Sequence, residues 1–193
     1  RRLGDQADPS SLDLIATEAE RLTLLVDSLR TVGLPVRTLR REIDPDEAVD
    51  AVLTLLAHQL LHRRIGVTRE THSEDARVLA DPAQVRQVVL NLVLNAADAM
   101  PRGGALRVTS IMAEERWVLV IEDEGPGVEP AAQNKLFDAF FTTKHKGLGI
   151  GLTTCKRLVT AHGGQLALDP SYRNGARFVV TWPAATSERT PRS

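Results

Sequence analysis

The chain has 193 residues, a formal net charge of −1 and 42% hydrophobic residues, which is enough to bury a core. The near-zero charge excludes the general attraction that draws basic proteins to nucleic acid or anionic membranes, so we expect no nucleic-acid partner. No apolar run approaches the roughly 20 residues of a membrane-spanning helix, and no signal peptide is recognisable. The single cysteine, Cys155, excludes an internal disulfide and favours a reducing, cytoplasmic location.

The first predicted element is a helix over residues 11–31. Apolar residues recur there at three- and four-residue spacing, which is the seam pattern of a coiled coil or helix bundle. Gly33 and Pro35 end the helix. Nothing earlier in the chain offers it a packing partner, so we expect the seam to meet another helix. Residues 1–35 are therefore predicted to be a bundle-type appendage.

Between residues 36 and 183 the pattern alternates between strands and helices. Two of the helices begin with the same device, an aspartate cap followed by proline, at Asp44 and Asp81. The expected strands are 36–43, 66–70, 77–80, 105–113, 117–123, 165–169 and 176–182, and the expected helices are 44–64, 81–100 and 150–162, with a short one between 123 and 151. This order predicts one α+β domain, a two-layer sandwich with helices on one face of a sheet. Residues 184–193 are expected to be a disordered tail.

The helix over 81–100 carries a polar stripe on an otherwise apolar surface. Gln87, Asn91 and Asn95 are spaced by four residues and Asp98 follows by three, so all four lie along one face. Buried amides are costly unless a partner satisfies them. The stripe is therefore either an exposed polar face or the wall of a cavity for a polar ligand, and the pattern alone leaves both open.

A second polar feature follows the apolar strand 117–123. Asp123 stands at the strand end, and Gly125 and Gly127 follow it. A carboxylate there can accept a hydrogen bond from the amino group of a base, while glycine permits close approach of the ring. An ordinary turn uses the same residue types.

A glycine-rich loop leads into the helix over 150–162. Gly147, Gly149 and Gly151 would present free N–H groups and a helix N-terminus to a phosphate, although the spacing is neither a Walker nor a Rossmann pattern. The preceding segment, residues 136–144, combines aromatic side chains with Thr142, Thr143 and Lys144. Hydroxyls and a cation suit a phosphate group.

Taken in order, the motifs N-x-x-x-N-A-x-D-A, D-E-G-P-G, F-D-A-F-F-T-T-K and G-L-G-I-G-L resemble the nucleotide-binding domain of sensor histidine kinases. That domain has the Bergerat ATP-binding fold, shared with DNA gyrase and MutL. The resemblance covers residues 36–183. The F-F-T-T-K segment, the short span to Gly147 and the later A-H-G-G resemble the nitrogen-regulation type in particular.

The resemblance implies roles for the candidate residues, with ATP and Mg²⁺ as ligands. Asn95 would give its carboxamide oxygen to Mg²⁺, a neutral ligand that does not repel the triphosphate. Asn91 would support the phosphates or a metal-bound water. Asp123 would accept from the adenine amino group, and Gly125 and Gly127 would shape the adenine slot.

The resemblance also implies a mobile lid over the nucleotide. Its parts would be Thr142, Thr143 and Lys144 at the start, and Gly147, Leu148, Gly149, Gly151 and Leu152 at the end, with Leu152 near the base. Phe137, Phe140 and Phe141 are expected to anchor the lid in the core. Two residues depart from the family pattern. Asp98 replaces a common lysine, so we expect no phosphate role for it, and Ala176 replaces the usual threonine.

Residues 14–26 resemble the second helix of the dimerisation and phosphotransfer hairpin of these kinases. The implied partners are a histidine-bearing helix of the same or a partner protomer and the receiver domain of a response regulator, with the full-length protein a homodimer. The first helix, which carries the phosphoacceptor, has no match in this chain. We therefore expect the γ-phosphoryl of ATP to pass to a histidine elsewhere, so that the fragment does not autophosphorylate.

Two alternatives remain. One is a nucleotide-sensing or docking module that transfers no phosphate. The other is a mechanical ATPase of the gyrase kind, which is disfavoured because Arg86 and Gln87 stand where those enzymes carry a catalytic glutamate.

The five histidines offer no substitute phosphoacceptor. His58 and His62 have a metal-binding spacing, but a solvated helix face explains them better. His162 ends a helix, where the interaction with its dipole is a sufficient reason for its presence.

Overall fold

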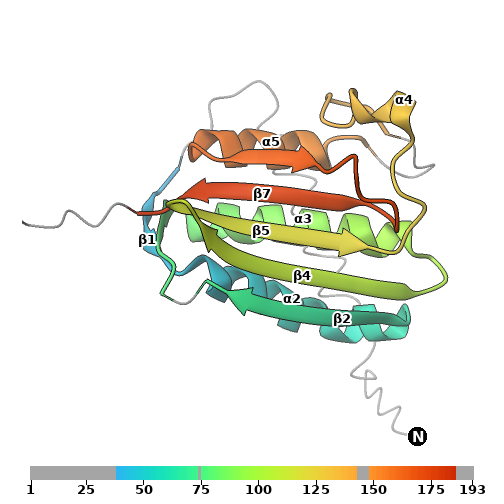
Figure 1. Cartoon of the computed structure of the whole chain (residues 1–193), viewed down its shortest axis with the longest axis horizontal. Coiled ribbons are helices and arrows are strands. Elements are labelled where there is room, and N and C mark those ends of the chain that lie inside the picture. Colours follow the sequence, from blue (N-terminus) through green and yellow to red (C-terminus); the bar gives the residue numbers. More distant parts are fainter. Residues whose placement is uncertain (1–37, 74, 143–147, 186–193) are drawn as a thin grey trace, which may run out of the picture.

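The computed structural model describes residues 38–73, 75–142 and 148–185. They form two layers, a five-stranded sheet and helices packed over one of its faces (Figure 1). The predicted α+β two-layer sandwich is therefore confirmed. The helix predicted over residues 11–31 lies outside the described residues.

The predicted helices and strands are found close to their expected positions. In chain order they are β1 (Arg41–Ile43), α2 (Pro45–His62), β2 (Ile65–His72), β3 (Val78–Ala80), α3 (Pro82–Ala99), β4 (Gly104–Ala113), β5 (Arg116–Asp123), α4 (Pro130–Gln133), α5 (Gly151–Ala161), β6 (Gln165–Leu168) and β7 (Arg177–Pro183). The strand expected over 36–43 is shorter than predicted, because residues 38–40 are not in a strand. Both aspartate caps form, with Asp44 accepting from the N–H of Asp46 and Asp81 from that of Ala83.

The large sheet has the strand order β2-β4-β5-β7-β6. β2 pairs with β4 in parallel, whereas β4–β5, β5–β7 and β7–β6 are antiparallel. β4 and β5 thus form an antiparallel hairpin. β1 and β3 form a separate two-stranded antiparallel sheet. Two consecutive strands of a parallel pair need a crossover, and α3 provides it between β2 and β4.

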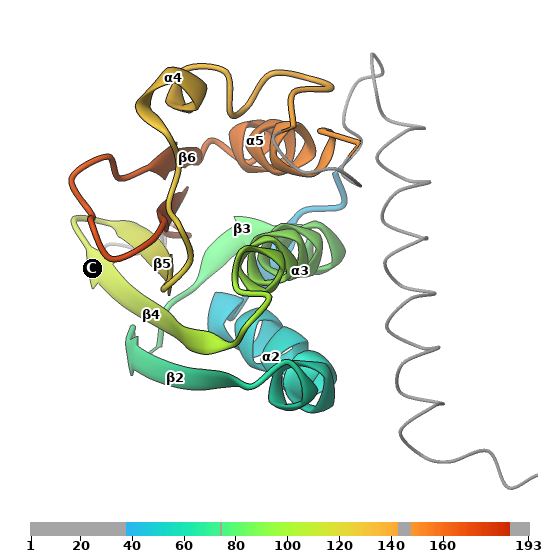
Figure 2. The same ribbon diagram turned by 90° about the vertical axis from the view of Figure 1, so that its right-hand side faces the viewer.

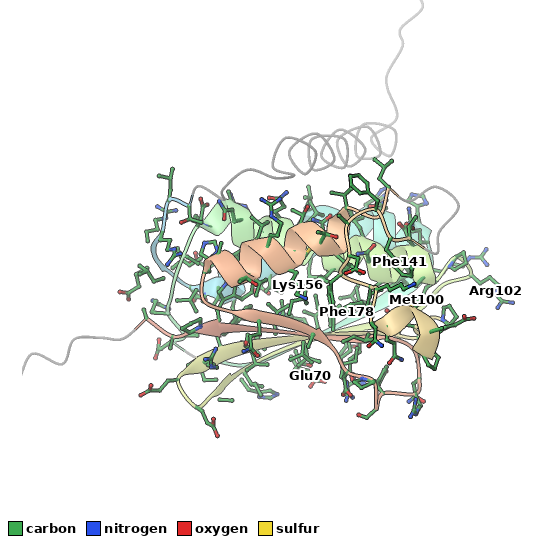
Figure 3. The ribbon with its side chains drawn as sticks, turned by 90° about the horizontal axis from the view of Figure 1, so that it is seen from above. Glu70, Met100, Arg102, Phe141, Lys156 and Phe178 are labelled. Atoms are coloured by element: carbon green, nitrogen blue, oxygen red, sulfur yellow. The ribbon has the colours of Figure 1, made fainter. Side chains whose placement is uncertain are left out.

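The hydrophobic core lies between the sheet and the three long helices. Figure 2 shows α2, α3 and α5 side by side along one face of the sheet, with α3 in the middle. Trp117 of β5 and Trp182 of β7 are both buried, with ring centroids 5.6 Å apart. Glu70 of β2 points away from the helices, on the open face of the sheet (Figure 3). Within the described residues, no helix is long and apolar enough to cross a membrane.

A buried polar network fastens the start of α2 to the sheet. The guanidinium of Arg69 lies 2.6 Å from a carboxylate oxygen of Asp46 and donates to the hydroxyl of Ser110 at 2.9 Å. Ser73 donates to the other carboxylate oxygen of Asp46. Each member has a partner, so this network has a structural explanation. The network holds the start of α2 against the sheet and does not involve α3 or α5.

Candidate functional site

The polar stripe of α3 is neither fully exposed nor in the core. Gln87, Asn91, Asn95 and Asp98 are all half-buried, while the intervening residues from Val88 to Ala97 are buried. An exposed polar face would leave these side chains open to solvent. The observed burial agrees with the cavity-wall interpretation of the sequence.

Asn91 lies where α3 meets the beginning of α5. A Cβ added to Gly151 would lie 3.6 Å from Oδ1 of Asn91. The Nδ2 atom of Asn91 is buried and has no hydrogen-bond partner within the described part of the chain. A buried amide donor without an acceptor costs about 1–3 kcal/mol. A ligand oxygen between α3 and α5 would supply the acceptor, so the residues present fit a phosphate or a metal-bound water at this place.

The thiol of Cys155 lies one turn along α5 from Gly151 and 3.8 Å from the carbonyl oxygen of Val88 on α3. Burial raises the pKa of this thiol from 9.0 to about 12, and the neighbouring amide of Asn91 opposes the shift. Sulfur is a weak acceptor, so this contact leaves Nδ2 of Asn91 in need of an oxygen acceptor. Cys155 is therefore a thiol packed in the core between α3 and α5.

Asp123 is fixed at the end of β5. It is only 3% exposed, and its Oδ1 accepts from the N–H of Gly125 at 2.9 Å and from that of Ala176 at 3.2 Å. Gly125 is crowded, since an added Cβ would lie 2.8 Å from Oδ1 of Asp123 and 2.9 Å from Cβ of Ala99 on α3. The carboxylate, the glycine and the end of α3 are therefore in contact.

Gly175, which the sequence analysis missed, is part of the same structure. An added Cβ there would lie 1.8 Å from the carbonyl oxygen of Asp123, and its φ is +149°. Gly127 has φ +73°, and a Cβ added to it would lie 2.9 Å from the carbonyl oxygen of Gly175. The Asn174-Gly175 pair directly before the last strand was the available sequence signal. Both glycines let the loop after β5 lie against the start of β7.

The aromatic segment before the glycine-rich loop is anchored through Phe137. The ring packs on the hydrophobic core, with Nζ of Lys156 5.1 Å from its centroid, and the hydroxyl of Thr153 donates to the Phe137 carbonyl at 3.1 Å. Figure 3 labels Lys156 on α5 and Phe141 near its beginning. The expected anchoring role is therefore confirmed for Phe137.

Phe140 does not anchor the segment in the core, contrary to the prediction. Its side chain is 64% exposed and its backbone is left-handed, with φ +65°. The reason is a backbone contact, because the N–H of Phe140 donates to the carbonyl of Gly149 at 3.0 Å. We call this contact the neck. The neck includes Gly149, where an added Cβ would lie 2.5 Å from the carbonyl oxygen of Phe141.

The remaining candidates of the loop are only partly described. Thr142 and Leu148 are exposed, and Leu152 is half-buried against the core. Thr143, Lys144 and Gly147 lie outside the described residues.

Asp98 and two histidines do not belong to the site. Asp98 pairs with Arg63, the residue that follows α2, at 2.9 Å. The rings of His58 and His62 meet edge to face at 4.4 Å, and the described residues contain no group of three or more histidine, cysteine, aspartate or glutamate residues that could hold a metal ion.

The prediction for His162 was incomplete. The side chain is buried, and besides its place at a helix end both of its ring nitrogens are within hydrogen-bond distance of backbone groups.

A comparison with protein-family models matches residues 80–186 to the family described as histidine kinase-, DNA gyrase B-, and HSP90-like ATPases. The matched range contains every candidate site residue named above. Among curated proteins, sporulation kinase C of Bacillus subtilis is 27% identical over 89% of this chain and 40% of its own length. The signal transduction histidine-protein kinase AtoS of Escherichia coli is 27% identical over 95% of this chain and 30% of its own length. The chain thus spans less than half the length of these relatives.

Solved structures of histidine kinases are also similar to this chain. The catalytic domain of histidine kinase ThkA is 30% identical with a TM-score of 0.69, covering 75% of this chain and 95% of that one. Full-length ShkA in complex with AMPPNP has a TM-score of 0.75 at 26% identity, covering 97% and 41%. ThkA in complex with the response regulator TrrA has a TM-score of 0.73 at 26% identity, covering 96% and 54%. None of these names identifies a nitrogen-regulation kinase, so that subtype stays a prediction.

Proposed function

Because the chain belongs to the family of histidine kinase-, DNA gyrase B- and HSP90-like ATPases, we propose that it is the ATP-binding catalytic domain of a sensor histidine kinase. In this proposal the domain transfers the γ-phosphoryl of ATP to a histidine on another segment or protomer. The observation that carries the proposal is the buried carboxylate of Asp123, which two backbone N–H groups hold in place beside α3.

Asp123 is the proposed adenine-recognition residue. An ionised carboxylate only accepts hydrogen bonds, so it selects a base that presents an amino group. The two backbone N–H donors stabilise the ionised form and fix its orientation. Gly125 and Gly127 are proposed to line the slot for the base, and Leu152 is proposed to lie near it.

Asn91 and Asn95 are the proposed phosphate and metal residues. Asn95 would offer a carboxamide oxygen to Mg²⁺, a ligand type that this hard cation accepts. Asn91 would donate its Nδ2, which has no hydrogen-bond partner among the residues that the structure describes, to a phosphate oxygen or to a metal-bound water. Mg²⁺, when bound, supplies neutralisation of phosphate charge.

The segment over residues 142–151, most of which lies between the two ends of the neck, is the proposed phosphate cover. Its candidate residues are Thr142, Thr143, Lys144, Gly147, Leu148, Gly149 and Gly151. Hydroxyl, ammonium and backbone N–H donors, together with the N-terminus of α5, would hold the phosphate charge. Catalysis by this chain then consists of positioning the nucleotide and stabilising its charge, as in phosphoryl transfer in general.

The wider assignments are part of the proposal. Residues 1–35 would be the remnant of the dimerisation and phosphotransfer hairpin, residues 36–183 the catalytic domain, and residues 184–193 a tail. The full-length protein would be a homodimer that phosphorylates the receiver domain of a response regulator, a class of partner with which ThkA forms its complex. A nitrogen-regulation subtype and a cytoplasmic location of the catalytic domain complete the proposal.

Two measurements test this function. Calorimetric titration of the chain with ATP, with and without Mg²⁺, should show binding that Mg²⁺ strengthens. Asn95→Asp should weaken Mg-ATP binding because it adds a negative charge beside the triphosphate. Gln87→Glu makes the same change two turns earlier on the stripe and should have a smaller effect. No binding by the unmodified chain would refute the proposal.

The second measurement addresses phosphotransfer. The chain is mixed with Mg-ATP labelled at the γ-phosphate and with a fragment that carries the histidine-bearing helix. Acid-labile label on the fragment is expected. Binding without transfer would instead support the nucleotide-sensing module as the function.

A further inference from the structure

α3 and α5 contact each other at three places along α5, and only the contact at the beginning of α5 belongs to the candidate nucleotide site. Gly151 faces Asn91 at the beginning of α5, and Cys155 faces Val88 in the middle. At the far end, His162 directly follows α5 and contacts Asp81, the cap of α3. With a rise of 1.5 Å per residue, the 11 residues of α5 span about 16 Å. The His162 contact is therefore at the opposite end of α5 from the site.

His162 is fully engaged and 5% exposed. The N–H of Asp81 donates to Nε2 at 3.1 Å, and Nδ1 lies 2.8 Å from the carbonyl oxygen of Leu158. A backbone N–H can only donate, so Nε2 is the accepting nitrogen. The ring proton is then on Nδ1 and is donated to Leu158. His162 thus joins the last turn of α5 to Asp81, the N-cap residue of α3, through one imidazole ring.

The same junction receives the segment over residues 38–40. The N–H of Leu39 donates to Oδ2 of Asp81 at 3.1 Å, while Oδ1 of Asp81 caps α3 through the N–H of Ala83 at 3.0 Å. The guanidinium of Arg40 donates to the carbonyl of Ala161, the last residue of α5. In Figure 1 the blue segment that leads into β1 passes this end of α5. The chain therefore enters the domain by contacting both helices that form the site.

We propose that His162 is a positioning residue that sets the separation of α3 and α5 at the nucleotide site, and that residues 38–40 act on this separation through the same junction. A helix transmits a displacement of one end to the other because its backbone is rigid. Displacement of residues 38–40 then alters the place where Asn91 and the N-terminus of α5 meet the phosphates. The inference rests on the proposed nucleotide site.

The first test replaces His162. His162→Leu removes both hydrogen bonds, whereas His162→Gln keeps an oxygen acceptor near the position of Nε2. Affinity for a fluorescent ATP analogue is measured at a temperature where thermal unfolding shows each variant to be folded. We expect His162→Leu to weaken binding about fivefold or more and His162→Gln to restore most of it. Equal affinity of His162→Leu and the unmodified chain would overturn the proposal, because a purely structural role changes stability alone.

The second test addresses residues 38–40. Arg40→Ala removes the contact with Ala161, and Arg41→Ala makes the same charge change one residue later, where the side chain lines a separate surface cavity with Asp44 and Arg77. Only Arg40→Ala should weaken nucleotide binding, and it should add little in the His162→Leu background because both act at one junction. Equal effects of the two arginine variants would contradict the coupling.

Hydrogen exchange separates this inference from the proposed function. Without nucleotide, His162→Leu should speed exchange at the amides of Asp81 and of the first turn of α5, including Thr154. If His162→Leu speeds exchange but the unmodified chain binds no nucleotide, the contact of His162 with α3 and α5 is supported and the proposed nucleotide site is refuted. Unchanged exchange near Thr154 with normal nucleotide binding would refute the junction alone.

Discussion

Asp123 and Ala176 are joined by two hydrogen bonds that run in opposite directions. The N–H of Asp123 donates to the carbonyl of Ala176 at 3.0 Å, and the N–H of Ala176 donates to Oδ1 of Asp123 at 3.2 Å. The carboxylate of Asp123 is therefore held by the backbone directly before β7. Both bonds use main-chain atoms of Ala176, so this contact does not depend on its side chain.

This relationship allows a test of base recognition. Asp123→Asn can keep the bonds from Gly125 and Ala176 through its amide oxygen, but it places an NH₂ donor where a carboxylate oxygen stood. We expect ATP affinity to fall about 10- to 100-fold, the effect of losing one charge-assisted hydrogen bond. Glu122→Gln is the matched control, since Glu122 faces the other side of β5 and contacts Arg177 at 2.7 Å. Unchanged affinity in Asp123→Asn would show that the base lies elsewhere.

The crowding at Gly125 predicts a stability effect. A Cβ there would lie 2.9 Å from Cβ of Ala99 and 3.1 Å from its carbonyl oxygen, so Gly125→Ala should lower the free energy of unfolding by about 1–3 kcal/mol. Gly66→Ala has no atom within 4 Å of the new Cβ and should be neutral or slightly stabilising. Urea unfolding curves measure both. Similar losses in the two variants would contradict the close contact at Gly125.

Cys155 predicts a dependence of stability on alkaline pH. The pKa of the folded thiol is about 12 against an ordinary value of 9.0, so the folded state keeps a proton that the unfolded state releases above pH 9. The contribution of this thiol to the free energy of unfolding is fully present below pH 9. It is lost as the pH rises towards 12, by at most about 1.4 kcal/mol per pH unit.

The matching variant is Cys155→Ala. It should be less stable at every pH because it leaves a cavity, but its stability should fall less steeply between about pH 9 and pH 11. Urea unfolding at about pH 8, 9.5 and 10.5 measures the two slopes. Parallel curves for the two proteins would show that the thiol does not titrate differently on unfolding.

The β4–β5 turn predicts a stabilising change. Glu114 and Glu115 are the two turn residues, and both have positive φ, 48° and 57°. This conformation favours asparagine and glycine. Glu114→Asn with Glu115→Gly should therefore raise the free energy of unfolding by about 0.5–1 kcal/mol. Glu129→Gly is the control, because it also removes a negative charge but at a residue with φ −58°, and it should not stabilise the protein. Urea unfolding of the variants separates the effect of turn geometry from that of lost charge.

Local patterns predicted much of the fold and the centre of the site. The four-residue spacing of Asn91 and Asn95 placed both on one face of a helix, and the two aspartate caps fixed where helices begin, because these features depend on neighbours within a few residues. The alternating pattern located the strands for the same reason.

Contacts between distant residues could not be predicted in this way. The parallel pairing of β2 with β4 depends on where α3 crosses, and a strand pattern does not specify its partner. The bond between His162 and Asp81 joins residues 81 positions apart. Phe140 was expected to anchor the lid in the core, but its backbone contact with Gly149, nine residues later, accompanies a side chain that points outward.

The neck between Phe140 and Gly149 separates the framework of the domain from the loop it closes. Because backbone atoms hold Phe140 and Gly149 together, we expect the start of α5 to tolerate changes in the number of residues between them. Doubling the length of a flexible loop costs only about 0.6 kcal/mol. Insertions and substitutions between residues 142 and 148 are thus cheap for folding. We therefore expect sequence changes in this stretch to leave the sheet and the three long helices folded.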